Sequence, residues 1–537
     1  MKVMWKAACA VVLLIAATTI EIGCGETYRP VATPLPVTTG NPSGFETEIV
    51  LSCCLDPRSL DAVSGAPSSK ITGINVSGDT NAGNKVLANV ASSLTFDYSR
   101  SIVFSTNPAT LAMPDSVTQV TISPSTAGFS ATNNTIVLEQ GSKPISMSFQ
   151  YFGVTYTQDY VVNSGATPTC PNGGSLGVIN QAGGRLKTPI CLDVDASTHA
   201  NPVLAWIYKD QTKVFVLDNN ASKIYVVSAS KYKVTNTILL PVGSAPIKAA
   251  QSADGNHIYV LDSGNGGSIS IIDGQMETAA TISTHSALSV AGSLPIDIAQ
   301  DTNFNDTTKN TQVNHVWILQ GDGTVSVYDG TAPGVLTWIT SLSTITPAQY
   351  AAGVRPTNLA LMRDGTQAYV GLAGTNQIVA INTSKLAQNA VTTNATSAIT
   401  LDVVAGGVSH RNITRTINGK LVTVENTTPT VNFVAVSRGG NTADLSKVYA
   451  TTTTSTTYFY YDSTGTQTSS ATYPNLFNGT AVVTAADNGT TPINTFVTTV
   501  LAPAVLTDCD TGNPATGEYD GQKSCPAMVP TLVLGRS

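Results

Sequence analysis

Residues 246–273 read PIKAAQSADGNHIYVLDSGNGGSISIID, and this stretch decides the fold because it recurs. A second copy, PTNLALMRDGTQAYVGLAGTNQIVAIN, occupies 356–382, and a third, PVLAWIYKDQTKVFVLDNNASKIYVVS, occupies 202–228. In every copy an Asp follows the leading proline by eight residues, an aromatic residue follows that Asp by five, and an apolar segment ends the copy. Self-similarity of this kind indicates a repeat architecture.

One copy is best explained as a four-stranded antiparallel β-blade. The proline suits the connection that enters a blade, where the ladder does not need its missing N–H. The Asp-Gly pair turns the first strand back, and the aromatic–aliphatic pair begins the second strand, with the aromatic ring between neighbouring blades. A single blade cannot cover both of its faces, so blades must pack side by side until a ring closes. The repeat therefore predicts an all-β fold, a β-propeller, in preference to a β-helix.

Two insertions interrupt the repeat. The aromatic positions Phe215, Tyr259, Trp317 and Tyr369 are separated by 44, 58 and 52 residues, and a polar insertion at 301–312 accounts for the longest interval. A further copy is centred on Tyr449, which leaves 80 residues after Tyr369 for an extra blade or a long insertion, placed at 385–430. Within it, Asn418-Gly419 between two alternating segments predicts a β-hairpin.

Composition excludes several classes of protein. Only 11% of the 537 residues are charged and 6% are aromatic, which suits short strands and polar turns better than solvent-facing helices. The net charge is −7 without a basic block, so we expect no nucleic-acid partner.

The first residues predict export. Lys2 and Lys6 precede an apolar run from Ala7 to Ile20 that is too short to span a bilayer. Cys24 after Gly23 resembles the bacterial lipobox, although Glu21 stands where an aliphatic residue is usual; ordinary signal cleavage nearby is the alternative. We expect lipidation at Cys24, followed by a Pro/Thr-rich tether.

The repeat resembles the YVTN-type β-propeller repeat of exported bacterial and archaeal proteins. Asp254-Gly255, Tyr259-Val260 and the strand ending at Asp273 carry the resemblance, which is close over 200–385 and weak before 190. The Asn of the motif is replaced, by Asp262 in one copy and Leu372 in another. The resemblance implies a ring of seven four-stranded blades and surface residence, and it implies no catalytic mechanism.

These observations predict five segments along the chain. They are a signal peptide at 1–23, a tether at 24–44, a degenerate β-rich segment at 45–190, propeller repeats at 191–475, and C-terminal strands with a disulfide loop at 476–537. For 45–190 the alternatives are the first blades of the ring or a separate immunoglobulin-like sandwich.

Six cysteines remain beyond Cys9 and Cys24, an even number that favours disulfides in an oxidising compartment. Cys170 with Cys191 and Cys509 with Cys525 are expected to pair locally. The adjacent Cys53 and Cys54 either bridge one another or bond elsewhere. The cysteines show no Cys-x-x-Cys spacing and have no His near them, so the sequence favours disulfides over a metal site.

The sequence shows no catalytic constellation. His257 and His315 occupy one repeat position and could line the ring axis around a metal, but other copies place Lys or Gln at this position, so we interpret both as strand residues beside a turn. Asp210, Asp254 and Asp364 are interpreted as turn formers. The acidic cluster Asp508, Asp510 and Asp520 is a weak calcium candidate; a solvated disulfide loop explains it better.

The sequence thus predicts an exported, lipid-anchored, non-enzymatic propeller that binds or scaffolds an unknown protein or glycan at the cell envelope. It predicts no cofactor, and membrane contact only through the lipid. The inserted loops 301–312 and 385–430 are the expected binding elements. The alternative is a propeller hydrolase or dehydrogenase acting on an extracellular sugar, lactone or amine.

Overall fold

A computed structural model describes the strands between residues 47 and 535 and some of the turns that join them. The described ranges are 47–54, 69–75, 80–87, 91–97, 102–109, 114–122, 129–149, 158–180, 188–193, 199–252, 254–283, 293–306, 311–361, 367–382, 396–400, 413–417, 420–426, 430–436, 447–453, 455–461, 467–474, 480–486, 495–501 and 529–535.

The described strands form nine four-stranded sheets, and every strand pair in them is antiparallel. We number eight of the sheets as blades. Blade 1 contains β36 (Val529–Gly535), β1 (Thr47–Cys54), β2 (Ser69–Asn75) and β3 (Thr80–Leu87). Blade 2 contains β4 (Ser93–Asp97), β5 (Ile102–Asn107), β6 (Ser116–Ile122) and β7 (Phe129–Val137). Blade 3 contains β8 (Pro144–Phe149), β9 (Gln158–Asn163), β10 (Ser175–Asn180) and β11 (Ile190–Cys191). Blade 4 contains β12 (Pro202–Ile207), β13 (Lys213–Asp218), β14 (Lys223–Ser228) and β15 (Lys233–Leu239). Blade 5 contains β16 (Pro246–Gln251), β17 (His257–Asp262), β18 (Ser268–Asp273) and β19 (Thr278–Ser283). Blade 6 contains β20 (Pro295–Asp306), β21 (Thr311–Gln320), β22 (Thr324–Asp329) and β23 (Thr337–Ser343). Blade 7 contains β24 (Arg355–Leu361), β25 (Gln367–Ala373), β26 (Gln377–Asn382) and β27 (Thr396–Thr400). Blade 8 contains β30 (Thr430–Val436), β31 (Lys447–Thr453), β34 (Thr480–Ala486) and β35 (Thr495–Leu501). The ninth, which we call the outlying sheet, contains β28 (Ile413–Ile417), β29 (Lys420–Asn426), β32 (Ser455–Tyr461) and β33 (Gln467–Pro474).

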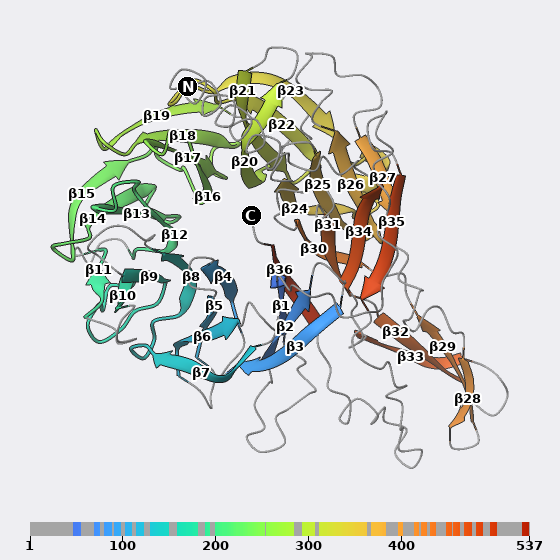
Figure 1. Ribbon diagram of the computed structural model, residues 1–537. Coiled ribbons are helices and arrows are strands. Elements are labelled where there is room, and N and C mark those ends of the chain that lie inside the picture. Colours follow the sequence, from blue (N-terminus) through green and yellow to red (C-terminus); the bar gives the residue numbers. More distant parts are fainter. Residues whose placement is uncertain are drawn as a thin grey trace, which may run out of the picture.

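The eight blades follow one another around a ring, so the fold is a β-propeller (Figure 1). The innermost strands of successive blades contact each other, from β4 through β8, β12, β16, β20 and β24 to β30. β36 lies between β30 and β4 and closes the ring. Because β36 pairs with β1, the closing blade joins the two ends of the chain.

The described ring has eight blades, one more than the resemblance implied, and the extra blade has a physical reason. Seven blades carry the repeat aromatic on their second strand, whereas the second strand of blade 1 is β1, TEIVLSCC, which has none. Its strands also come from opposite ends of the chain, so no continuous repeat marks it. The strands within 45–190 contribute to blades 1 to 3 of the ring and do not form a separate sandwich.

The repeat aromatics form the core between blades, as the pattern predicts. They are Phe104, Tyr160, Phe215, Tyr259, Trp317, Tyr369 and Tyr449, each at most 1% exposed. Tyr259 packs with Ile298 and Val316 of the next blade, and Trp317 packs with Val370 of the blade after it. Five of the rings lie in apolar clusters shared with the next blade: Phe104, Tyr160, Phe215, Tyr259 and Trp317.

The leading prolines begin the innermost strands, where we expected them. Pro144, Pro202, Pro246 and Pro295 are each the first residue of such a strand and pair with the last residue of the second strand. The ladder shifts register directly after each of them. An innermost strand pairs on one side only, so it tolerates the missing N–H, and the bulge adds local twist.

The direction of the innermost strands defines two faces of the ring. We call the face where these strands begin the leading face and the face where they end the trailing face. Connections between successive blades lie on the leading face, including the five-residue helix α2 (Pro347–Ala351). No helix in the described part of the chain is long and apolar enough to cross a membrane.

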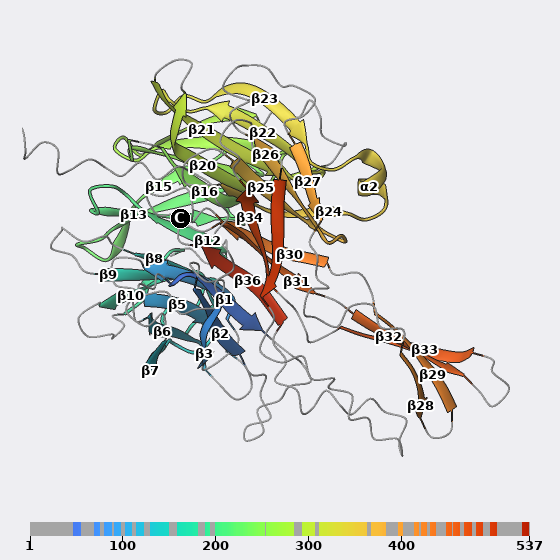
Figure 2. The ribbon, with the colours of Figure 1, turned by 45° about the vertical axis from the view of Figure 1, so that its right-hand side comes forward.

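The outlying sheet stands off the ring beside blade 8 (Figure 2). Its two hairpins alternate along the chain with the strand pairs of blade 8. β29 ends shortly before β30 begins, β32 begins directly after β31 ends, and Thr430 pairs with Thr453 at that end of the blade. The outlying sheet therefore leaves from the leading face. The hairpin predicted at Asn418-Gly419 is present, because Ile417 pairs with Lys420.

The first insertion, 301–312, extends β20 and β21 into a longer hairpin in which Asp306 pairs with Thr311. This extension lies where β20 ends, on the trailing face. The two insertions thus lie on opposite faces of the propeller.

Candidate functional site

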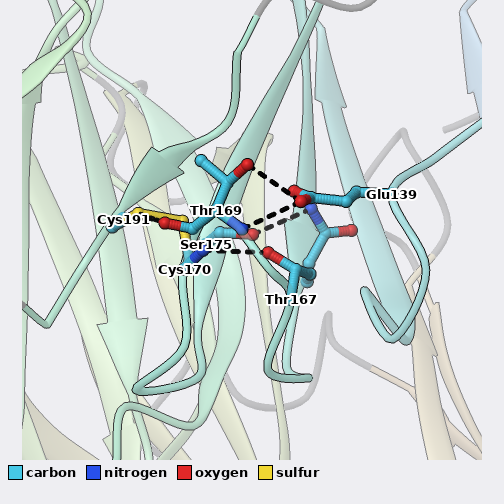
Figure 3. Close-up of a disulfide and its surroundings, with 7 residues drawn as sticks. Glu139, Thr167, Thr169, Cys170, Ser175 and Cys191 are labelled. Carbon is cyan, nitrogen blue, oxygen red and sulfur yellow. Dashed lines mark hydrogen bonds between the residues drawn. A yellow bond between two sulfur atoms is a disulfide. The ribbon is translucent and has the colours of Figure 1, made fainter.

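Cys170 and Cys191 form a disulfide, the pairing expected from their spacing (Figure 3). The bridge ties the turn after β9 to the short edge strand β11 of blade 3. Beside it, the backbone N–H and the hydroxyl of Thr169 each donate to Glu139 Oε1 at 2.8 Å. Burial alone raises the pKa of Glu139, but the hydrogen bonds from Thr169 outweigh it and leave this pKa below its ordinary value.

Several predicted site residues lie outside the described residues. These are Cys24, Cys509, Cys525, Asp364, Asp508, Asp510 and Asp520. Cys53 and Cys54 lie on β1, but their side chains are not described. Lipidation, the second local disulfide and the weak calcium site therefore stay predictions.

The two repeat histidines lie on second strands, away from the innermost strands around the ring axis. His257 Nδ1 is 3.8 Å from Asp254 Oδ1 and its Nε2 is 3.9 Å from Asp273 Oδ2. His315 is 2% exposed and its ring stands edge-on to Trp317. In the part of the chain that the structure describes, no group of three or more His, Cys, Asp or Glu could hold a metal ion.

The turn aspartates cap their turns. Asp254 Oδ1 accepts from the Asn256 N–H at 3.0 Å and the Ser252 hydroxyl at 2.6 Å. Asp210 Oδ1 accepts from the N–H and hydroxyl of Thr212 at 2.9 and 2.7 Å. Their carboxylates are used in the turn itself, as predicted.

A belt of buried polar side chains runs around the leading end of the second strands. Its members each follow a repeat aromatic by three residues and are at most 2% exposed: Asn107, Asn163, Asp218, Asp262 and Gln320. Four of them bond a hydroxyl on the third strand of their own blade. For example, Asn163 Nδ2 donates to Ser175 Oγ at 3.2 Å (Figure 3 labels Ser175). We call these five residues the polar belt.

The two carboxylates of the polar belt have different surroundings. Asp218 accepts four hydrogen bonds, from the N–H groups of Asn201, Asn220 and Ala221 and from the Tyr225 hydroxyl. Asp262 accepts only from the hydroxyls of Ser268 and Ser270, and its Oδ1 has no partner among the described residues. Burial therefore raises the pKa of Asp262 to about 6, although the serine hydroxyls lower it in part.

The polar belt was not among the predicted sites, although a fixed offset in the sequence marks it. The belt position lies two residues beyond the aromatic–aliphatic pair, and it is the one at which Asp262 and Leu372 replace the Asn of the repeat motif. Phe104–Asn107 and Tyr160–Asn163 have Asn at that position. They lie in the part of the chain where the resemblance looked weakest.

A second group of polar contacts joins three innermost strands, and we call it the inner-strand bracket. Asp297 on β20 accepts from Lys248 Nζ on β16 at 2.8 Å and, through its other oxygen, from the N–H of Leu359 on β24 at 2.9 Å. The Asp297 side chain is 8% exposed and that of Lys248 45%. The bracket links blades 5, 6 and 7 close to the ring axis.

No protein-family model and no curated protein matches the sequence. The fold itself defines the class, a β-propeller, and solved structures of that class are similar to it. The periplasmic gluconolactonase PpgL of Pseudomonas aeruginosa has 16% identity and a TM-score of 0.43, with 62% of this chain and 92% of that one covered.

Two more solved structures are similar at the same level. Kuenenia stuttgartiensis hydrazine synthase has 14% identity and a TM-score of 0.42 over 66% of this chain and 91% of its own. The dihydro-heme d1 dehydrogenase NirN has 11% identity and a TM-score of 0.48, with 83% of this chain and 78% of its own covered. Likeness at this level carries no argument about activity.

Proposed function

We propose that this chain is an exported, lipid-anchored β-propeller of the YVTN-repeat type that binds a protein or glycan partner at the cell envelope. In this proposal the outlying sheet is the recognition element and the ring is its rigid support. The observation that carries the proposal is the position of that sheet. It is inserted in blade 8 through two separate hairpins and stands off the leading face.

The ring does not need the outlying sheet to close. Blade 8 has its own four strands, and its innermost strand lies between β24 and β36. A sheet added through two chain crossings is held more firmly than a single loop, because each hairpin continues into a strand pair of the blade. Such a sheet suits recognition, since rigid elements place binding groups more accurately than flexible loops do.

Export is supported by two independent features. The N-terminal sequence has the charge and length of a signal peptide. The Cys170–Cys191 disulfide is the kind of bond that persists in oxidising compartments.

The test is a variant that lacks residues 413–426 and 455–474, with the cut ends rejoined by short Gly/Ser links. We expect it to keep the thermal midpoint of the ring and to lose partner capture after crosslinking in the native envelope. The matched control shortens the hairpin at 301–312, which lies on the trailing face, and should capture as the unaltered chain does.

Two results would contradict the proposal. One is full capture by the variant without the outlying sheet. The other is turnover of a sugar lactone or amine by the purified chain, which would favour the hydrolase or dehydrogenase alternative.

A further inference from the structure

Three large apolar side chains are exposed on the trailing face of two neighbouring blades. Met276 is 68% exposed in the turn between β18 and β19 of blade 5. Val335 is 54% exposed in the turn between β22 and β23 of blade 6, and Trp338 is 42% exposed near the start of β23. Both turns lie where the third strand ends, on the face where the innermost strands also end.

The turn of blade 6 leans toward blade 5. A Cβ added at Gly334 would lie 2.7 Å from Nε2 of His257, so the backbone of this turn contacts blade 5 directly. Trp338 pairs with Tyr328, which lies in the apolar cluster shared by blades 5 and 6. Val335 and Trp338 therefore lie on the trailing edge of blade 6 beside blade 5, whose own trailing turn carries Met276.

Trp338 suits a boundary between water and lipid. Its indole Nε1–H donates to Ser341 Oγ at 3.1 Å, so its polar end is satisfied while part of its ring is exposed. Tryptophan with one apolar and one polar end is enriched at membrane interfaces.

The N-terminal tether joins the ring on the same face. β1 pairs antiparallel with the innermost strand β36, so β1 begins at Thr47 on the trailing face. Cys24 precedes Thr47 by 23 residues, a length that spans at most about 80 Å when fully extended. In a ring of eight sheets, blade 5 lies opposite blade 1.

We propose that the trailing edge of blades 5 and 6 rests on the lipid surface, with Met276, Val335 and Trp338 in the headgroup region. The inference rests on the lipid anchoring of the proposed function. A single attachment at blade 1 would let the ring turn about that point, whereas a second contact on the opposite side of the ring limits the turning. The leading face and the outlying sheet then point away from the membrane.

The contact depends on apolar burial more than on charge. Exposed charges at the neighbouring turns are mixed, with Lys209 and Lys231 beside Asp210 and Asp254. We therefore expect the lipid contact to change little with ionic strength.

The test uses the mature lipidated protein in vesicles of phosphatidylethanolamine and phosphatidylglycerol whose acyl chains carry bromine, which quenches nearby tryptophan. Trp317 is fully buried and Trp206 is partly buried between blades, so Trp338 is the tryptophan placed to meet lipid. We expect a roughly twofold loss of the Trp338 emission, and Trp338→Phe should remove the quenched component. Met276→Ser with Val335→Ser should reduce the quenching without changing the thermal midpoint.

The matched control moves the probe to the leading face. Val242 is 94% exposed there, so Val242→Trp in the Trp338→Phe chain should stay unquenched. Equal quenching at both faces, or none at Trp338 in vesicle-bound protein, would overturn the inference and leave the anchor and the binding role intact. Protein that does not associate with the vesicles at all would contradict the anchor as well. Quenching that persists in a Cys24→Ala chain would support the lipid contact and contradict only the need for the anchor.

Discussion

Asp262 shows how one residue of a repeat can carry a cost that the other copies avoid. Two other blades place Asn at the same belt position, and Asp218 has four donors for its carboxylate. Asp262 has two hydroxyls and an unpaired buried oxygen. A buried carboxylate with too few donors holds its proton to a higher pH.

We predict that Asp262→Asn stabilises the protein at neutral pH. The pKa of Asp262 is about 6 in the folded protein, against 3.8 ordinarily. Between these values the unfolded chain ionises while the folded chain keeps its proton, so native stability falls as pH rises and stays low above pH 6. The substitution should therefore gain up to about 3 kcal/mol above pH 6 and almost nothing below pH 4. Chemical unfolding at pH 4 and pH 8 measures both.

The control for this prediction is Asp218→Asn. Its amide would place a donor where Asp218 now accepts from the Tyr225 hydroxyl, so we expect a loss of about 1–2 kcal/mol at pH 8. A gain for both substitutions would show that the repeat position tolerates Asn regardless of its donors.

The Asp-Gly turn offers a second prediction at this scale. Gly255 has a φ of 70° after Asp254, and Gln211 has a φ of 61° at the same position after Asp210. Left-handed backbone costs a residue with a Cβ roughly 1 kcal/mol, so Gln211→Gly should stabilise by up to about that amount. The reverse change, Gly255→Gln, should destabilise, because a Cβ there would lie 2.9 Å from Gln251 Nε2. Thermal unfolding of both variants decides the matter.

At the scale of strands, the inner-strand bracket makes one residue more important than its partner. Asp297→Ala would leave the buried N–H of Leu359 without its acceptor and remove the contact to Lys248. We predict a loss of about 2–4 kcal/mol. Lys248→Ala should cost at most about 1 kcal/mol, since the lysine is half exposed and Asp297 keeps two backbone donors. Equal losses in urea unfolding would show that the ion pair, not the backbone acceptor, holds the blades together.

The individual blade could be predicted from the sequence because its signals are local. The leading proline, the Asp turn and the buried aromatic each act within about thirty residues of one another, and all three lie where their chemistry requires. Blade 1 could not be predicted in this way, since β36 and β1 come from opposite ends of the chain. The outlying sheet could not be predicted either, because its hairpins alternate along the chain with those of blade 8. A hairpin pattern in the sequence does not show which other hairpin it pairs with.

Among the candidate sites, the covalent and turn chemistry could be predicted from the sequence, whereas the position of a site in the ring could not. The Cys170–Cys191 pairing and the capping by Asp210 and Asp254 follow from short spacings. Which face an insertion leaves from depends on strand direction in the closed ring. Whether the insertions at 301–312 and 385–430 share a face therefore could not be predicted from the sequence, and the strand directions place them on opposite faces.

At the scale of the whole molecule, ring closure depends on a single C-terminal strand. β36 is the innermost strand of blade 1 and lies beside both β30 and β4. We predict that a chain ending at residue 528 unfolds at a clearly lower temperature than the full chain, because blades 8 and 2 lose the strand between them. Hydrogen exchange should lose protection first in β1, which pairs with β36, and only later in blades 4 to 6. A synthetic peptide of residues 523–537 should restore protection by adding the missing strand, while a scrambled peptide should not. An unchanged unfolding temperature in the shortened chain would mean that the remaining seven blades and β1–β3 already hold the ring closed.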